Sequence, residues 1–184
     1  MRLRSRHGHL VELRPLRPMD AIALDPLLHD GSLTRMLPPR VRRESGKQFV
    51  QRVLQEQRQG DGFAFVVLHA GSPDVIGQIR LMNWVKVERH AEVGYWIQRK
   101  HWGKGYGTEA LRLICKFGFE SLGLHRIEAS VVDGNDRSAG VLENIGFRLE
   151  GRSRRSALVS RRWADTLEFG LLREEWQAYV HSSR

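Results

Sequence analysis

Three alternating glycines in the middle of the chain constrain its fold more than any other feature of the sequence. Gly103, Gly105 and Gly107 lie between an apolar, alternating segment and a long stretch of helical periodicity. Glycine has no Cβ, so successive amides of such a turn can point at one ligand, and a helix that follows adds the positive end of its dipole. Lys104 adds a nearby cation. The segment predicts a strand, a pyrophosphate-binding turn and a helix, although an ordinary glycine-rich turn before a helix remains the alternative.

Two better-known glycine motifs do not fit this segment. A dinucleotide-binding fold carries G-x-G-x-x-G directly after its first strand, with an acidic residue about twenty positions later. Here the pattern is G-x-G-x-G, it follows several predicted strands, and Glu128 at the matching distance lies inside a predicted strand. The G-x-x-x-x-G-K-[ST] pattern of nucleoside triphosphatases is missing as well. The sequence therefore disfavours both classes of nucleotide-binding protein.

The spacing of apolar residues predicts a mixed α/β sheet, because alternation indicates strands and a spacing of three and four indicates helices. The predicted strands span residues 10–16, 63–68, 75–81, 90–97, 127–132, 147–152 and 163–172, and the predicted helices span residues 18–29, 44–59, 107–122 and 138–144. The second and third strands flank Gly71-Ser72-Pro73-Asp74 and should pair as a hairpin. This order predicts an α/β (α+β) fold, and no linker or repeat divides residues 1–184 into more than one domain.

Length and composition set the class of protein. The 184 residues are 41% apolar, which is enough for one hydrophobic core. Apolar runs stay shorter than the roughly 20 residues of a membrane-spanning helix, and residues 1–6 do not resemble a signal peptide, so we predict a cytoplasmic protein. The net charge of +9 favours anionic partners such as a phosphorylated cofactor, nucleic acid or ribosomal surfaces. A solvated, solubilising surface explains the arginines equally well.

Neither disulfide nor metal chemistry is indicated. The single cysteine, Cys115, cannot form an internal disulfide, and it shares a helical spacing with Leu111 and Ile114, which favours core packing over a catalytic thiol. The eight histidines are scattered and form no HExxH pattern. We therefore predict no metal site.

Four separated segments resemble the GNAT family of N-acetyltransferases and, within it, the Rim-type branch that acetylates the N-termini of ribosomal proteins. They are Ala-Glu-Val-Gly-Tyr-Trp-Ile at 91–97, Trp-Gly-Lys-Gly-Tyr-Gly-Thr-Glu-Ala at 102–110, Asn-x-x-Ser leading to Asn-Ile-Gly-Phe at 135–147, and 165–176. The resemblance covers most of the chain after Phe63. It implies one GNAT domain with a mixed, mostly antiparallel sheet of six to seven strands, about four flanking helices and a central strand pair that splays apart.

The same resemblance implies acetyl-CoA as the cosubstrate and assigns its binding to particular residues. The glycine turn would hold the pyrophosphate through its amides, the end of the strand over 90–97 would pair with the pantetheine arm and offer an amide to the thioester carbonyl, and the Asn-x-x-Ser motif would lie near the thiol. Trp102 stands where the family usually has glutamine or arginine, a departure that leaves the amides unchanged. The assigned residues are Trp96, Ile97, Gly103, Lys104, Gly105, Tyr106, Gly107, Thr108, Asn135 and Ser138.

The resemblance is less definite about catalysis. Many relatives carry a tyrosine as general acid where this chain has Leu142, so the acid must come from elsewhere, and Ser138 is the candidate near the thiol. An α-amine ionises at about 7.7 to 8.0, so a base or a water chain must remove a proton before attack. Glu150 matches the glutamate that the Rim-type branch places beside the amine, and Glu92 is the rival. Helix capping by Asn135 and Ser138, and ordinary strand carboxylates, are the alternatives.

Together these features predict direct transfer of an acetyl group to a primary amine in a ternary complex, with a protein N-terminus as the acceptor that the resemblance implies. An antibiotic or polyamine acceptor, and a basic coenzyme A-binding module that docks on RNA or the ribosome without turnover, are the alternatives. The segment over 28–43 should border the acceptor but carries no motif that names it. The resemblance leaves ribosome association and a homodimer open.

Overall fold

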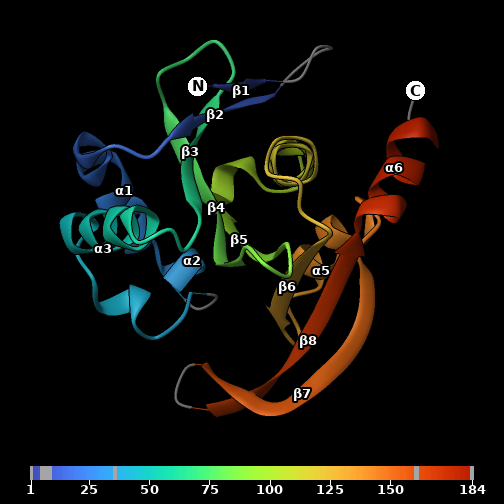
Figure 1. Ribbon diagram of the computed structural model, residues 1–184. Helices are drawn as coiled ribbons and strands as arrows, with labels where there is room; N and C mark the ends of the chain where they lie inside the picture. The colour runs from blue at the N-terminus through green and yellow to red at the C-terminus, as the bar shows by residue number, and fades with distance from the viewer. Residues whose placement is uncertain (1, 5–9, 35–36, 160–161, 183–184) are drawn as a thin grey trace.

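An eight-stranded sheet organises the protein (Figure 1). The structure, a computed structural model, describes residues 2–4, 10–34, 37–159 and 162–182. The strand order is β1-β2-β3-β4-β5-β6-β8-β7. The strands are β1 (Leu3–Arg4), β2 (Val11–Pro15), β3 (Phe63–His69), β4 (Val75–Val85), β5 (His90–Ile97), β6 (Arg126–Val132), β7 (Arg148–Val159) and β8 (Arg162–Leu172). The helices are α1 (Ala21–Leu28), α2 (Gly31–Thr34), α3 (Gly46–Arg58), α4 (Tyr106–Lys116), α5 (Asp136–Glu143) and α6 (Arg173–Ser182).

The predicted fold class is confirmed, with differences in individual elements. The predicted strands and helices all have counterparts, and a further strand, β1, pairs with β2 in the described part of the chain. Strand β7 continues to Val159, beyond the predicted end, because it pairs with β8 along almost its whole length. The predicted helix over 107–122 is α4 followed by a π-helical turn at Phe117–Ser121. Helix α6 was not predicted.

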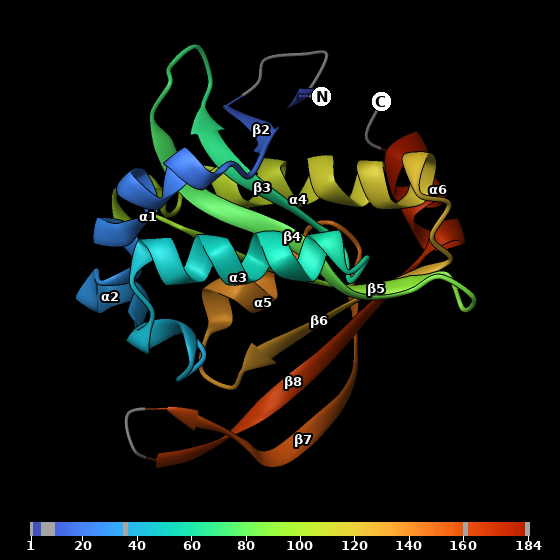
Figure 2. The same cartoon turned by 60° about the vertical axis from the view of Figure 1, so that its left-hand side comes forward.

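Strands β5 and β6 form the one parallel pair of the described sheet, and they separate after three positions. His90, Ala91 and Glu92 pair with Arg126, Ile127 and Glu128. Beyond Glu92 the strand keeps its antiparallel ladder with β4, and β6 keeps its own with β8. Figure 2 shows the two strands meeting at one end and diverging toward the other. The splayed central pair expected from the resemblance is therefore present.

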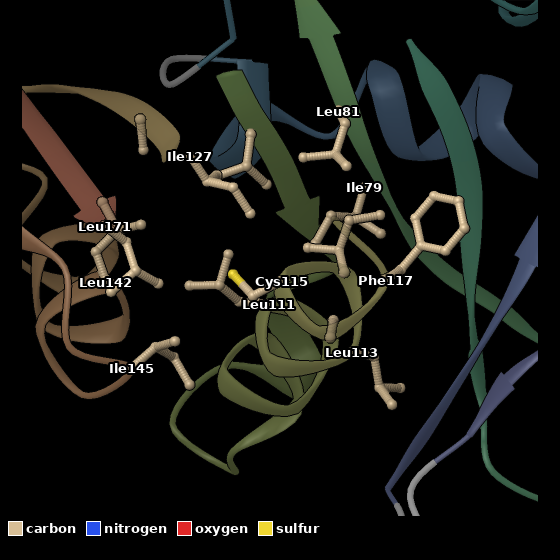
Figure 3. Close-up of a cluster of buried hydrophobic side chains, with 14 of the residues drawn as sticks. Ile79, Leu81, Leu111, Leu113, Cys115, Phe117, Ile127, Leu142, Ile145 and Leu171 are labelled. Carbon is tan, nitrogen blue, oxygen red and sulfur yellow. The ribbon is translucent and has the colours of Figure 1, made fainter. Parts of the chain in front are cut away.

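Each face of the sheet has its own core. Helices α4, α5 and α6 cover one face, where Leu111 and Cys115 of α4 pack against Ile127 and other apolar side chains (Figure 3). Helices α1 and α3 cover the opposite face over β3 and Trp96 of β5. Burial raises the pKa of the Cys115 thiol, so this cysteine is a core residue, as the helical spacing predicted.

Helices α1 and α3 approach closely because of a glycine. Ser45 caps α3 by accepting from the Gln48 amide, and the next residue, Gly46, donates its own amide to Asp25 of α1 (2.5 Å). A Cβ at Gly46 would overlap the Ala21 carbonyl oxygen of α1 and come within 2.8 Å of the Asp25 Cβ. This contact sets the spacing of the two helices that cover Trp96. Within the described chain, none of the helices combines the length and apolar character needed to cross a membrane.

Replacing Gly46 with alanine should therefore destabilise the protein, since the added methyl group meets backbone rather than a flexible side chain. We expect Gly46→Ala to lower the free energy of unfolding by about 1–3 kcal/mol. Gly31→Ala is the matched control, because a Cβ at Gly31 meets nothing within 4 Å. Chemical denaturation of the two variants measures both values, and equal stabilities would contradict this account of the α1–α3 contact.

Candidate functional site

A cavity of about 560 Å³ lies where β5 and β6 separate. Successive side chains of a strand point to opposite faces of a sheet. Tyr95 of β5 packs with the core beneath α4, whereas Trp96 packs with α1 and α3 on the other side. Both side chains line the cavity, which therefore opens through the sheet from one face to the other. The segment from Leu37 to Arg42, within the predicted acceptor border, lines it together with the tip of the β7–β8 hairpin.

Backbone amides of β5 face this opening. In an antiparallel ladder, bonded residues alternate with residues whose amides point away from the partner strand. The Gln98 amide donates to the Ile76 carbonyl (2.7 Å), so the next bonded residue along β5 is Trp96. The amides of Tyr95 and Ile97 therefore point toward β6, where no strand pairs with them. Trp96 and Ile97 were both expected to offer an amide to the cofactor; of these two, Ile97 is the one whose amide faces the gap.

The glycine turn has the geometry that the sequence predicted. Gly103 and Gly105 have φ values of +71° and +82°, which side chains rarely allow, and Gly105 is the N-cap of α4. A glycine cap brings no side-chain oxygen to the first amides of the helix, which begins at Tyr106 and continues through Gly107 and Thr108. These amides are oriented to bind an anion. Lys104 is exposed beside them.

The glycine turn and the cavity are contiguous. A Cβ at Gly107 would lie 3.7 Å from the Tyr95 ring, which lines the cavity, and 3.8 Å from Val141 of α5. A ligand with an anionic group at the helix start and an extended arm can therefore reach the opening on the α4 face. This arrangement fits coenzyme A, whose pyrophosphate and pantetheine arm have that order. The described residues contain no group of His, Cys, Asp or Glu side chains suited to a metal ion.

Trp102 fixes the end of β5 beside the turn. Its indole Nε1 donates to the Ile97 carbonyl (2.6 Å), which holds that carbonyl away from any strand pairing. The guanidinium of Arg137, in the first turn of α5, stacks on the Trp102 ring at 4.2 Å from its centroid. The residue that departs from the family pattern thus positions a second cation near the glycine turn. The sequence reasoning missed Arg137, whose only signal was its place inside the Asn-x-x-Ser motif.

The predicted residues Asn135 and Ser138 both line the cavity. Asn135 also caps α5 by accepting from the Ser138 amide (3.4 Å), so capping and a cavity position coexist. The Ser138 hydroxyl lies 3.3 Å from the hydroxyl of Tyr95. Burial raises the pKa of Tyr95 to about 12, against the opposing effect of that hydrogen bond, so the phenol stays protonated. Tyr95 was missed as a site residue, although alternation along 91–97 places it on the face of the glycine turn.

Glu92 is the last residue of β5 that pairs with β6, and its side chain lines the cavity on the face opposite α4. Its carboxylate accepts a hydrogen bond from Nδ2 of Asn83 (2.8 Å). Burial raises the pKa of Glu92, with Asn83 and the nearby Arg80 opposing the shift. A carboxylate with a raised pKa at the edge of a cavity is a candidate general base.

The structure does not bring Glu150 to the cavity. A register shift between Leu149 and Gly151 turns its side chain over Gly170, where Arg126 binds both carboxylate oxygens. The hydrogen bonds from Arg126 lower the pKa of Glu150. Glu150 therefore does not lie in the expected place beside the amine. Its position matches the alternative interpretation, an ordinary carboxylate on a strand that is paired with a basic residue. Of the two predicted bases, Glu92 alone lines the cavity.

Comparisons with known proteins agree with this geometry. The family model described as Acetyltransferase (GNAT) domain matches residues 11–148. An N-acetyltransferase of Bacillus licheniformis, p20, is 30% identical over 166 residues, 89% of this chain and 93% of that protein. The Escherichia coli (strain K12) [ribosomal protein uS5]-alanine N-acetyltransferase is 31% identical over 120 residues, 65% of this chain.

The matches to some relatives are shorter. The alignments span 62% of that Escherichia coli enzyme and 63% of YdaF from Bacillus subtilis (strain 168), which is 38% identical over 117 residues, 64% of this chain. Among solved structures, Mycobacterium smegmatis RimJ in complex with CoA-disulfide superposes with a TM-score of 0.83 at 30% identity, covering 100% of this chain and 94% of that one. A relative that binds coenzyme A therefore has this fold across the whole chain.

If the glycine turn binds the pyrophosphate of coenzyme A, Gly105→Val should abolish binding, because a β-branched side chain cannot adopt φ +82° without strain. Wild type should gain about 2.7 kcal/mol of stability at coenzyme A concentrations of roughly 100 times Kd. Gly71→Val is the matched control, since Gly71 has φ +75° in the β3–β4 turn. Thermal unfolding with and without coenzyme A should show a shift for Gly71→Val and none for Gly105→Val; a full shift in a folded Gly105→Val protein would disprove the assignment.

Proposed function

The chain belongs to the GNAT family of acetyltransferases, and from this we infer that it transfers the acetyl group of acetyl-CoA to a primary amine, which we propose is the N-terminal α-amine of a protein. One observation carries the proposal: the cavity crosses the sheet, with the glycine turn and Tyr95 on one face and Glu92 on the other. A donor and an acceptor can therefore meet inside it from opposite sides. The named activity of the uS5-alanine N-acetyltransferase supports the choice of acceptor.

On the donor side, the chain supplies backbone groups. The amides of the glycine turn bind the pyrophosphate, and Arg137 and Lys104 add positive charge. The amides of Tyr95 and Ile97 face the gap and are placed to bind the pantetheine arm and to stabilise negative charge on a carbonyl oxygen. Acetyl-CoA supplies the thioester whose carbonyl carbon is attacked. The chain provides orientation and charge stabilisation, and no covalent link to a side chain is required.

On the acceptor side, Glu92 removes the proton. An α-amine is largely protonated below its pKa of about 7.7 to 8.0, and only the neutral form attacks. The raised pKa of Glu92 makes the carboxylate a stronger base than an exposed glutamate. Glu92 takes one proton from the ammonium before attack, directly or through one water. The nitrogen–carbon bond then forms, the carbon–sulfur bond breaks, and the second proton of the nitrogen passes to solvent as the amide is formed.

The leaving thiolate also needs a proton. The Tyr95 hydroxyl is protonated because burial raises its pKa to about 12, and it lies 3.3 Å from the Ser138 hydroxyl on the face of the glycine turn. We assign the proton donation to this pair, with Tyr95 as donor and Ser138 as the group that orients or relays it. The pair replaces the tyrosine that many relatives carry at the position of Leu142, which is fully buried here.

A panel of acceptors tests the proposed function. Purified protein is incubated with acetyl-CoA and peptides that begin with alanine or serine, spermidine, or an aminoglycoside, and release of free coenzyme A is measured. We expect kcat/KM for a peptide to exceed that for the other two by at least roughly tenfold, because acceptor contacts decide the specificity. Preferred acetylation of spermidine or the aminoglycoside would contradict the N-terminal assignment. Coenzyme A binding without turnover of any acceptor would indicate the binding-module alternative.

Glu92→Gln separates the two predicted bases, because it preserves shape and removes basicity. We expect kcat/KM to fall about 10²- to 10⁴-fold near neutral pH and the loss to shrink at high pH, where free amine is already present. The wild-type rate should fall as pH drops through the raised pKa of Glu92. Glu150→Gln is the matched control and should keep a near-normal profile. A collapse of Glu150→Gln at low pH beside an active Glu92→Gln would return the role of base to Glu150.

A further inference from the structure

A buried glutamine lines the cavity with an unpartnered side-chain NH₂ group. Gln78 lies on β4 and is 2% exposed. Its Nε2 has no hydrogen-bond partner among the residues that the structure describes. Buried amide groups in native proteins are almost always hydrogen-bonded. Neither the glycine turn nor the proton transfers proposed above use Gln78. A donor held in this way inside a binding cavity is a recognition group for a ligand oxygen.

The position of Gln78 identifies which ligand it faces. It pairs across the ladder with Trp96, so both side chains lie on the face of α1 and α3, opposite the glycine turn. Phe49 of α3 and Leu37 line the same cavity and provide apolar surroundings. The pantetheine arm belongs at the edge of β5, one strand away and toward the other face. Gln78 therefore faces the acceptor.

The spacing along the sheet fits a short peptide segment. Met82 pairs with Glu92, so Gln78 stands four residues along β4 from the position opposite the proposed base. Four residues of a strand span about 13 Å. An extended peptide covers about 3.3–3.6 Å per residue. A peptide whose nitrogen lies near Glu92, directly or through one water, therefore places its first carbonyl groups along the path to Gln78.

Charged side chains on the face of α1 and α3 bear on which acceptor the cavity binds. Glu92 and Glu128 are neighbours across the β5–β6 pair, and Glu168 of β8 binds the Ser130 hydroxyl at the cavity wall (2.6 Å). Among the residues that line the cavity, Glu92 is the carboxylate and Arg42 and Arg80 are the cations, whereas Glu128 is bound by Arg126 (2.8 Å). An ammonium group is attracted to Glu92, and a carbonyl oxygen to the NH₂ group of Gln78. A cation followed closely by a carbonyl is the chemistry of a peptide N-terminus, whereas a polyamine offers no oxygen.

We propose that Gln78 donates a hydrogen bond to an amide carbonyl of the acceptor, close to the reacting amine, and thereby selects acceptors that carry this carbonyl. The proposal rests on the proposed function and deepens it. Gln78 acts on specificity rather than on the chemical step. Its removal should change the use of carbonyl-bearing acceptors and leave coenzyme A binding as it is.

Two acceptors of matched shape test this. Alanine N-methylamide carries the carbonyl, and 2-aminopentane has a similar carbon frame without it. For Gln78→Met, we expect kcat/KM with alanine N-methylamide to fall about 5- to 150-fold, the usual effect of losing one buried hydrogen bond. The value for 2-aminopentane should stay within about twofold of wild type, as should the Kd for coenzyme A. Gln78→Glu, which keeps the shape but cannot donate when ionised, should lose the same preference. Gln55→Met, on the exposed side of α3, is the control.

Equal losses with both acceptors, an unchanged preference, or an effect on coenzyme A binding alone would each overturn the role of Gln78. Melting temperatures show whether a variant is folded, and Gln78→Met should be at least as stable as wild type because it removes an unpartnered polar group. Normal acetylation of N-terminal peptides by Gln78→Met would refute this inference and leave the proposed function standing. A different result is that the wild-type protein does not acetylate N-terminal peptides, while Gln78→Met loses activity toward another carbonyl-bearing amine. That result would support the role of Gln78 and refute the N-terminal acceptor.

Discussion

The early end of hydrogen bonding between β5 and β6 is the constraint on which the site depends. After Glu92 the two strands keep their outer partners but not each other, so each presents a row of backbone groups to the gap. Unpaired backbone groups are costly when buried, and a ligand with peptide-like amides can satisfy them. The ladders with β4 and β8 hold the gap open, and the bond from Trp102 to Ile97 fixes its outer end. In the proposed function, the pantetheine arm of the cofactor would complete the hydrogen bonding that the two strands lack.

Much of the fold could be predicted from the sequence, at the positions where local chemistry decides the structure. The glycines at Gly103 and Gly105 predicted a turn before a helix; the turn is present, and both residues have positive φ in it. Helix α6 was not predicted, because β8 runs directly into it at Arg173 without a glycine or proline at the junction. Its position is fixed by Trp176, which stacks on Phe119. Tertiary contacts of that kind leave little local signal.

The candidate site could be predicted only in part, for the same reason: tertiary contacts decide where some of its side chains lie. A motif match placed Glu150 beside the amine, but a register shift in β7 and the guanidinium of Arg126 decide where that side chain lies, and neither is visible along the chain. Alternation along a strand places Tyr95 and Trp96 on opposite faces. Only the structure revealed that the sheet opens between them. The same holds for charge: in a chain with a net charge of +9, the charged residues that line the cavity are Glu92, Arg42 and Arg80.

In the proposed function a single strand serves both substrates, and this would limit how the chain can vary. From Glu92 to Ile97, alternate side chains of β5 lie on opposite faces of the sheet, those proposed for the acceptor and for the donor, so inserting or deleting one residue there would exchange the two sets. Such a change would point Tyr95 at the amine and Glu92 toward α4. Substitutions on the acceptor face, by contrast, leave the donor face intact. Relatives with this architecture can therefore diverge in acceptor through point changes while the length of this strand is held constant.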